Sequence, residues 1–210
     1  MIISIGGNIG SGKSTIIKKI KSHYTTIRCI PEPIDEWGEW LGKFYEDPKK
    51  YALGFQLKIL NAFNYIDNPS DIYVTERSPW ESKHVFADLL HKQGLLTPIE
   101  LALYNDFYKE KAWEPQYYIY LYTNYTECIQ RIHKRNRNEE TSINEDYVSE
   151  LHDQYNKVFS MSNASNQHIV SDYAIGYTLL NGIHVYLIDS NRPVDEVFGN
   201  VSLVLNRIVL

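Results

Sequence analysis

The stretch Ile2–Ser14, IISIGGNIGSGKS, decides the fold of this 210-residue chain. Its first residues, Ile2 to Ile5, form a short β-branched run of the kind that makes a buried strand. Residues 7–14 then satisfy the phosphate-loop pattern G-x-x-x-x-G-K-[ST], and apolar residues at helical spacing predict a helix from Lys13 to His23. A strand, a glycine-rich turn and a helix form the context in which this motif binds phosphate. We therefore expect an α/β fold with a nucleotide site after the first strand.

Each residue of the loop has an expected part in holding ATP. Gly7, Gly10 and Gly12 let the backbone curl so that successive N–H groups face one anion at the positive end of the helix. Lys13 is expected to reach the β- and γ-phosphates, and Ser14 to offer its hydroxyl to Mg²⁺. The remaining residues expected to contact the nucleotide are Asn8, Ser11 and Thr15, of which Thr15 is also expected to pack along the helix. The alternative is a glycine-rich turn that binds nothing, which the full match disfavours.

Strands and helical patterns alternate along the rest of the chain. Further strands are predicted at 27–30, 71–76, 117–122 and 183–188, and helices at 48–65, 80–92, 98–111, 125–134, 144–159 and 194–208. Pro31 and Pro33 predict an extended exit from the second strand, and residues 160–182 show no firm pattern. The alternation predicts a parallel sheet of about five strands flanked by helices, with ligands beyond the carboxyl ends of the strands. The chain has no internal repeat and no long linker, so we expect residues 1–210 to form one domain.

Composition narrows the functional classes. With 21 Lys and Arg against 26 Asp and Glu, the net charge of −5 argues against general nucleic-acid binding, which needs a clustered positive excess. The first apolar run ends at Gly6, far short of the roughly 20 residues that span a bilayer, and leaves no room for a targeting peptide. The two cysteines, Cys29 and Cys128, have no disulfide or metal-ligand spacing. We therefore expect a cytoplasmic protein that binds neither nucleic acid nor membrane.

Three charged residues are predicted to lie at the carboxyl ends of strands, where the phosphate loop also points. Glu32 stands on a stiff segment between two prolines, and a carboxylate there is suited to take the proton of an alcohol that accepts a phosphoryl group. Glu76 is suited to hold the water shell of Mg²⁺, and Arg77 to spread positive charge over the transferring group. The alternatives are a solvated loop glutamate for Glu32 and a structural ion pair for Glu76 and Arg77.

An arginine-rich segment lies at the end of the helix predicted at 125–134. Arg131, Arg135 and Arg137 fall within seven positions, and several guanidinium groups closing over ATP would neutralise developing charge and exclude water. We therefore expect a lid that contributes Arg135 and Arg137 to catalysis and Arg131 to nucleotide binding. A solvated, charged helix end is the alternative.

Four separated blocks make the chain resemble the deoxynucleoside kinase family. They are GGNIGSGKST at 6–15, PEPIDEW at 31–37, ERSPWESKHVF at 76–86 and RIHKRNRNEETSINEDYVSELH at 131–152, in the family's order over nearly the whole chain. The resemblance implies a P-loop kinase fold with an arginine-rich lid, and ATP and Mg²⁺ as cofactors. It further implies transfer of the γ-phosphoryl group to the 5′-hydroxyl of a deoxyribonucleoside, and a homodimer with contacts along helices such as 98–111.

The resemblance also assigns roles to individual residues. Glu32 matches the general base, and Arg77 matches an arginine near the 5′-hydroxyl. The matches expected around the rest of the nucleoside are Tyr45 and Glu140 at the sugar 3′-hydroxyl, Gln56 at the base edge, and Trp37 and Phe86 on the two sides of the base. An amide offers one donor and one acceptor, so by flipping Gln56 can pair with either thymine or cytosine.

Two positions depart from the deoxycytidine and deoxyguanosine kinases of the family. Where those enzymes have an arginine and an aspartate that select amino-bearing bases, this chain has Phe63 and Ser82. Thymidine-accepting relatives likewise lack the charged pair. We therefore expect a pyrimidine nucleoside as substrate, with thymidine favoured and Ser82 at the base.

Two other functions remain open from the sequence. A nucleoside monophosphate kinase such as thymidylate kinase would share the fold, the loop and the lid, but the carboxylate of Glu32 would repel its acceptor phosphate. A non-enzymatic nucleotide-binding switch would not need Glu32, Arg77 and the arginine-rich segment together.

Overall fold

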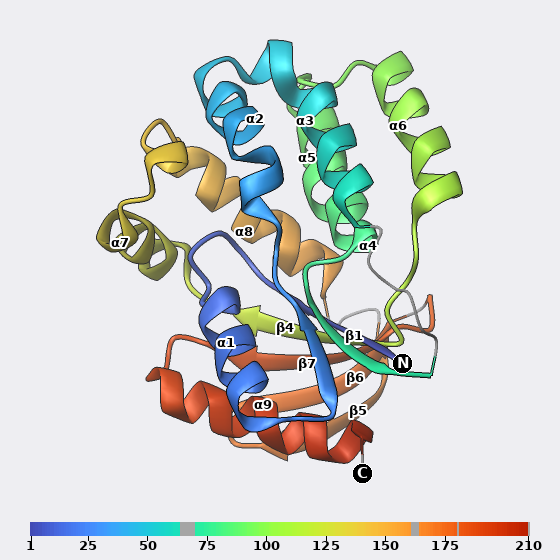
Figure 1. Ribbon diagram of the computed structural model, residues 1–210, viewed down its shortest axis with the longest axis vertical. Coiled ribbons are helices and arrows are strands. Elements are labelled where there is room, and N and C mark those ends of the chain that lie inside the picture. Colours follow the sequence, from blue (N-terminus) through green and yellow to red (C-terminus); the bar gives the residue numbers. More distant parts are fainter. Residues whose placement is uncertain (64–69, 161–163, 180, 210) are drawn as a thin grey trace.

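The computed structural model describes residues 1–63, 70–160, 164–179 and 181–209, which build a seven-stranded sheet with helices on both faces (Figure 1). The strand order is β2-β3-β1-β4-β7-β6-β5. The first five strands in this order run parallel, and β6 and β5 extend one edge as antiparallel strands. The strands are β1 (Ile2–Gly6), β2 (Ile27–Ile30), β3 (Ile72–Glu76), β4 (Tyr117–Tyr122), β5 (Ala164–Ser171), β6 (Ala174–Leu179) and β7 (His184–Asp189). The expected α/β architecture is confirmed.

Helices cover both faces of this sheet. α1 (Lys13–His23) and α9 (Val194–Val209) lie on one face, and α2, α3, α5 and α6 stand above the sheet in Figure 1. The bounds of the other helices are α2 (Ile34–Glu46), α3 (Pro48–Ala62), α4 (Pro79–Glu81), α5 (Asp88–Lys92), α6 (Pro98–Lys111), α7 (Tyr125–Arg135) and α8 (Glu145–Val158), with a π-helical turn η1 (Ser82–Ala87) and a 3₁₀ turn η2 (Asn138–Glu140). Within the described ranges, no helix combines the length and the apolarity needed to cross a lipid bilayer.

The alternation of side chains along the central strands explains both helical layers. Ile3 and Ile5 of β1 pack with α1 and α9, whereas Tyr118 and Tyr120 of the neighbouring β4 pack with α8 on the opposite face. A third apolar cluster joins α2, α3 and α6, and Tyr104 is fully buried in it.

The register of the parallel strands brings three chain segments to one edge. Ile5 pairs with Glu76, and Ile30 pairs with Thr75, so β1, β2 and β3 end side by side. The segments that follow these strands begin the phosphate loop, carry Glu32, and carry Arg77. They therefore meet beyond the carboxyl ends of the sheet.

The sheet has seven strands instead of the expected five. Residues 160–182, for which the sequence predicted no helix or strand, contain β5 and β6. Five consecutive residues of β5 are exposed, and its Ile169 is 77% exposed. An edge strand exposed on both faces has no reason to alternate apolar with polar residues, so the sequence carries no strand period there.

Residues 31–33, expected to be an extended exit from the second strand, lie outside helices and strands, but the sequence analysis did not predict α2, which begins directly after them. Proline at the start of a helix costs nothing, since its missing N–H would have no helical partner there, and Asp35 and Glu36 suit the positive helix end. The helix predicted at 48–65 ends at Ala62, and its last two residues lie outside the described ranges.

Candidate active site

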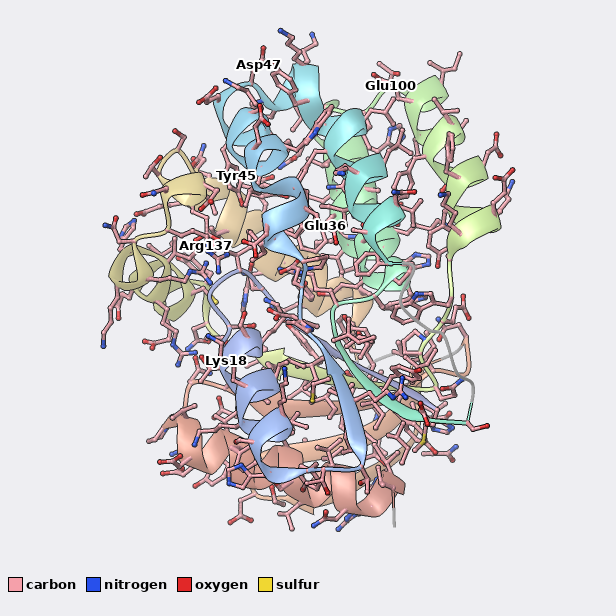
Figure 2. The ribbon with its side chains drawn as sticks, in the orientation of Figure 1. Lys18, Glu36, Tyr45, Asp47, Glu100 and Arg137 are labelled. Carbon is pink, nitrogen blue, oxygen red and sulfur yellow. The ribbon has the colours of Figure 1, made fainter. Side chains whose placement is uncertain are left out.

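A cavity of about 460 Å³ lies where the phosphate loop, α2, α3 and the arginine-rich segment meet. Figure 2 labels three of its lining residues, Lys18 on α1, Tyr45 on α2 and Arg137 after α7, which reach it from separate elements. Most residues expected at the site line this cavity: Gly10, Gly12, Lys13, Ser14, Thr15, Glu32, Trp37, Tyr45, Glu76, Arg77, Ser82, Phe86, Arg131, Arg135, Arg137 and Glu140. The expected residues that do not line it are Gly7, Asn8, Ser11 and Gln56.

The phosphate loop is a tight turn in which Gly7, Gly10 and Gly12 all have positive φ angles. Gly10 and Gly12 have φ angles of 81° and 97°, in the left-handed region. A Cβ atom on Gly10 would lie 2.5 Å from the carbonyl oxygen of Cys128, so the loop touches α7 directly. Gly12 then caps the start of α1, where backbone N–H groups without helical partners favour an anion.

Lys13 places a cation at the same helix end. Its Nζ donates to the carbonyl oxygens of Gly7 at 3.0 Å and of Asn8 at 2.8 Å. Burial, with a further contribution from the charge of Arg77, lowers the pKa of Lys13 to about 8. A nearby anion would stabilise the charged form of this buried ammonium group, so the loop is suited to bind phosphate.

Other expected loop residues have different surroundings. Asn8 ties the loop to α8, since its Nδ2 donates to the carbonyl of Val148 at 2.9 Å. The carbonyl of Ser11 accepts from Ser190 Oγ at 2.9 Å. Thr15 is exposed and lines the cavity. The expectation that Thr15 packs along the helix is therefore wrong, because α1 turns its isoleucines towards the sheet instead.

Ser14 and Glu76 form an oxygen-rich corner of the cavity. Ser14 Oγ donates to Glu76 Oε1 at 2.7 Å, and the N–H of Glu32 donates to Glu76 Oε2 at 3.5 Å. In the part of the chain that the structure describes, no three His, Cys, Asp or Glu side chains gather into a protein metal cage. Mg²⁺ held by one or two protein oxygens, waters and phosphates needs no such cage, so this donor set fits it.

Arg77 is the centre of a buried ionic network. It directly follows β3 and lies in the left-handed region with a φ of 66°, which is uncommon for a residue other than glycine. Its Nε lies 2.9 Å from Oε1 of Glu32, and its Nη1 lies 2.9 Å from Oε1 of Glu81. Nη1 also donates to the hydroxyl of Tyr155 at 2.8 Å, and the ring centre of Phe86 lies 4.6 Å from the guanidinium carbon. Two carboxylates and an aromatic face thus fix the guanidinium plane.

Glu32 is held in surroundings that favour its protonated form. Only 13% of its side chain is exposed, and this burial raises the pKa of the carboxyl above its ordinary value of 4.5. The Arg77 charge opposes that rise, and the Glu76 charge adds to it. A carboxylate with a raised pKa is a stronger base, so the arrangement suits proton acceptance.

Glu81 is a site residue that sequence reasoning missed. It is 0% exposed, and its carboxylate accepts from the N–H of Gly7 at 3.4 Å and from the hydroxyls of Tyr118 and Tyr155. The carboxylate therefore connects the phosphate loop to Arg77. Its spacing of four residues from Arg77 at a helix start was the only sequence signal of this pairing.

The arginine-rich segment folds around one buried carboxylate. Arg135 Nη2 lies 2.7 and 2.5 Å from the two carboxylate oxygens of Glu140, and Arg137 Nη1 lies 3.2 Å from its Oε1. Glu140 is only 5% exposed. Arg131 instead pairs with Glu127 at 2.8 Å and donates to the Ser190 carbonyl at 3.0 Å. The solvated helix end proposed as the alternative is therefore disfavoured.

Aromatic and aliphatic side chains line the cavity beyond Glu32. They are Trp37, Leu41, Phe44, Tyr45, Phe55, Ile59, Phe63, Phe86 and Tyr147. The rings of Trp37 and Phe55 meet edge-on with centres 5.7 Å apart. Burial, with Tyr147 and Glu140 nearby, raises the pKa of Tyr45 well above its usual range, so its hydroxyl stays a hydrogen-bond donor. This end of the cavity suits a flat ring with a polar attachment.

Gln56 lies in the wall behind this aromatic region. It is 1% exposed, its Oε1 accepts from Ser82 Oγ at 3.3 Å, and its buried Nε2 has no hydrogen-bond partner among the residues that the structure describes. Ser82 Oγ in turn accepts from the hydroxyl of Tyr104 at 3.3 Å. Tyr104 is the second site residue that the sequence did not reveal.

A neighbouring cavity of about 430 Å³ shares Gly12, Thr15 and Arg131 with the first. The segment after β7 supplies much of its remaining wall, with Ser190, Asn191, Arg192 and Pro193. It adjoins the loop on the side away from Glu32, which does not line it.

Known proteins resemble this chain in sequence and in fold. The family model described as deoxynucleoside kinase matches residues 3–196. The chain is 34% identical over 211 residues to protein 029R of Invertebrate iridescent virus 3, an alignment that covers 99% of this chain and 97% of that protein. It is 30% identical over 188 residues to deoxycytidine kinase 2 of Gallus gallus, covering 71% and 70% of the two chains. A solved structure of deoxyadenosine kinase from M. mycoides, with dCMP and a flexible dCDP bound, has a TM-score of 0.79 at 24% identity and covers 99% of this chain and 100% of that chain. At 24% identity, the similarity to the solved structure shows a shared fold.

Proposed function

The chain belongs to the deoxynucleoside kinase family, and on that premise we propose that it transfers the γ-phosphoryl group of ATP to the 5′-hydroxyl of a pyrimidine deoxyribonucleoside, with thymidine favoured. Membership makes it an enzyme that phosphorylates nucleosides. The observation that carries the proposed transfer to a hydroxyl is the buried pair of Glu32 and Arg77, which share one cavity with the phosphate loop.

In the proposed reaction, Glu32 takes the proton of the 5′-hydroxyl. The 5′-oxygen then bonds to the γ-phosphorus, the bond to the β,γ-bridging oxygen breaks, and ADP leaves with that electron pair. Oε1 of Glu32 lies 2.9 Å from Arg77, so Oε2 is the oxygen free to accept the proton. The raised pKa of Glu32 makes it a better acceptor than an ordinary glutamate.

Cations of this chain surround the transferring group in the proposed site. Lys13 and Arg77 stabilise charge that grows on the phosphoryl oxygens, and Arg135 and Arg137 approach from the other wall. Ser14 and Glu76 are the residues that would hold Mg²⁺, which neutralises charge on the β- and γ-phosphates when it is bound. We assign the adenosine part of ATP to the neighbouring cavity, because that cavity adjoins the loop at Gly12 and Thr15.

The apolar lining of the nucleoside end supports a base with an apolar substituent. Trp37 and Phe86 are proposed to flank the base, Tyr45 and Glu140 to hold the 3′-hydroxyl, and Gln56 with Ser82 to read the base edge. Phe63 offers apolar surface, which suits the methyl group of thymine. A relative in the same family is named deoxycytidine kinase 2, so the test below compares the pyrimidine nucleosides directly.

A nucleoside monophosphate kinase would need an unpaired cation for the phosphate of its acceptor. Arg77 is paired with Glu32 and Glu81, and Glu32, placed at the acceptor in the proposed site, would repel a phosphate carried by the acceptor itself. The geometry therefore favours an uncharged alcohol as acceptor.

We also propose a homodimer that acts in the cytoplasm. Ile99, Leu103 and Phe107 are 79%, 45% and 39% exposed and follow one another at four-residue intervals along α6. Such a stripe lies on one helix face and would be covered by a second copy. Cys29 and Cys128 are both free thiols, as suits a reducing compartment.

The test is a phosphate-transfer panel. The four deoxynucleosides and their four monophosphates are each incubated with the enzyme, ATP and Mg²⁺, and ADP release is measured beside labelled product. We expect release with pyrimidine deoxynucleosides, most with thymidine, and none with the monophosphates. The Lys13→Ala variant is the control for contaminating kinases. Release with thymidylate but not thymidine would overturn the proposal.

A further inference from the structure

The turn between β5 and β6 is fastened to the segment that follows β7. The N–H of Asp189, the last residue of β7, donates to the carbonyl oxygen of Tyr173 at 3.0 Å. Ser171 Oγ donates to Oδ1 of Asn200 on α9 at 2.5 Å and accepts from the N–H of Tyr173 at 3.2 Å. Figure 1 shows the two strands beside α9 at this edge of the sheet. The turn is therefore held at a defined place next to residues 190–193.

The ring of Tyr173 supports the guanidinium group of Arg192. The guanidinium carbon lies 4.0 Å from the ring centre, a distance that leaves no room for another atom between them. Nε of Arg192 also lies 3.4 Å from Oδ2 of Asp189. An arginine side chain that is 42% exposed would otherwise sample many rotamers, so the ring and the carboxylate together hold it in one orientation.

Arg192 brings hydrogen-bond donors to the neighbouring cavity of about 430 Å³, whose wall it helps to form. A guanidinium group carries five N–H donors, and among the described residues Asp189 is the only polar partner of this one. Arg131, the other arginine of the cavity, is held by Glu127 at 2.8 Å and by the carbonyl of Ser190 at 3.0 Å. Most donors of Arg192 are therefore available to a ligand.

A guanidinium group held in this way suits the base of a nucleotide. Its planar face stacks on aromatic rings, and its N–H groups donate to acceptors such as the ring nitrogens of adenine. The proposed function assigns the adenosine part of ATP to this cavity. A flexible arginine loses rotamer freedom when it binds a ligand, and that loss lowers the affinity. An arginine that a ring and a carboxylate already hold has lost much of this freedom before the ligand arrives.

We propose that Tyr173 is a positioning residue that, by holding Arg192 against its ring, raises the affinity of the enzyme for the base of its phosphoryl donor. The inference rests on the proposed function, since it concerns the donor of the proposed reaction. Tyr173 does not line the cavity, so its effect on the nucleotide passes through Arg192. The hairpin of β5 and β6 thereby takes part in nucleotide binding.

Substitutions on the hairpin and at Arg192 separate this role from a structural one. Tyr173→Ala removes the ring, Arg192→Ala removes the guanidinium group, and Tyr173→Phe keeps the ring that makes the contact. Ile169→Ala, at a residue of β5 that is 77% exposed, is the matched control on the same hairpin. A double variant that combines Tyr173→Ala with Arg192→Ala completes a cycle, which measures whether the two side chains act together.

The measurements are the affinity for ADP by isothermal titration calorimetry and KM for ATP at saturating deoxynucleoside. We expect Tyr173→Ala to weaken both about three- to tenfold, the size expected when one flexible side chain must be ordered on binding. Arg192→Ala should weaken them at least as much, and the double variant should resemble Arg192→Ala, because Tyr173 then has nothing to position. Tyr173→Phe and Ile169→Ala should bind ADP as the wild type does. In Tyr173→Ala, kcat should change far less than KM, since the base is bound alike before and during transfer.

Tripolyphosphate separates recognition of the base from recognition of the phosphates. It carries no base, so Tyr173→Ala should bind it with wild-type affinity. Ser190 Oγ donates to the carbonyl of Ser11 in the phosphate loop, so a general disturbance of residues 190–193 would weaken tripolyphosphate as well. The inference is overturned by equal weakening of ADP and tripolyphosphate, by unchanged ADP affinity in Tyr173→Ala, by a loss in Tyr173→Phe as large as in Tyr173→Ala, or by additive losses in the double variant.

The two proposals fail in different ways. A wild-type enzyme that binds ADP but phosphorylates no deoxynucleoside removes the proposed function, and its ADP affinity still tests the role of Tyr173. A wild-type enzyme that transfers phosphate, with no loss of ADP affinity in Tyr173→Ala, keeps the function and removes the inference. The stoichiometry of each titration reports the folded fraction, so a loss of folded protein is distinguished from a loss of affinity.

Discussion

Nε of Arg77 lies 2.9 Å from Oε1 of Glu32, with only 9% and 13% of the two side chains exposed. Arg77→Ala would leave Glu32 and Glu81 without their shared cation, which typically costs about 3–5 kcal/mol of unfolding free energy for a buried pair. We expect a lower melting temperature and turnover reduced by orders of magnitude. Arg77→Lys should keep more stability but little activity, because an ammonium cannot reproduce the planar contacts to both carboxylates. Turnover near normal in Arg77→Lys would contradict this role.

Glu32→Gln tests proton acceptance directly. The amide keeps the shape of the side chain but cannot take the hydroxyl proton, so kcat should fall by about 10²–10⁴-fold with little change in nucleoside affinity. Steady-state kinetics and binding followed by tryptophan fluorescence give the two quantities separately. Glu39→Gln, at an exposed position of α2, is the matched control and should behave as wild type. A change in kcat of less than about threefold in Glu32→Gln would remove the mechanism.

Glu81→Gln is expected to reduce kcat by a factor on the order of ten or more, because a charge-assisted hydrogen bond to Arg77 becomes a neutral one. Four charged groups act on Glu32, namely Arg77, Glu76, Lys13 and Glu81, and the Glu81 charge is one of those that raise the Glu32 pKa. Removal of that charge should move the acid limb of the kcat/KM profile to lower pH. Tyr118→Phe removes an uncharged donor to Glu81 and should leave the limb in place. A role in folding alone would lower stability without moving the limb.

The lowered pKa of Lys13 predicts that kcat/KM for ATP falls at alkaline pH. Its pKa is lowered to about 8 by burial, so the ammonium charge is present below that pH and is lost as the pH rises through it. The kcat/KM for ATP, which reports the free enzyme, should therefore fall above pH 8. At saturating ATP the fall should come at higher pH, because the phosphate charges stabilise the ammonium. A kcat/KM profile that stays flat through this range would contradict the assignment.

The exposed stripe on α6 predicts the assembly state. Leu103→Glu places a charge in the centre of the proposed contact and should shift the protein towards monomer in analytical ultracentrifugation. Leu203→Glu on α9, at a leucine that is 49% exposed, is the control and should leave the sedimentation coefficient unchanged. A wild-type protein that remains monomeric at all concentrations would remove the dimer.

Local patterns were sufficient for the parallel part of the sheet and for the phosphate loop. The loop is continuous in sequence, and Glu76 with Arg77 follows a strand of strong β-branched character, so both could be predicted. The P-loop fold and the family are confirmed, whereas the single domain and the individual roles of the site residues stay predictions.

What the sequence did not reveal depends on contacts between distant segments. Glu81 is recognisable only when Tyr118 and Tyr155 lie against it, and Tyr104 only when α6 lies beside Ser82. The edge strand β5 was missed because its exposure removes the alternation on which strand prediction depends.

The strand order also determines how the chain acquires its site during synthesis. β6 pairs with β5 and β7, its neighbours along the chain, whereas β1 pairs, within the described residues, with β3 and β4 at residues 72–76 and 117–122. Contacts between distant segments form more slowly than contacts between neighbours, because a long loop must first close. We therefore expect the first strand to complete its pairing only after the middle of the chain has been made, and the phosphate loop at its end to become fixed after β4.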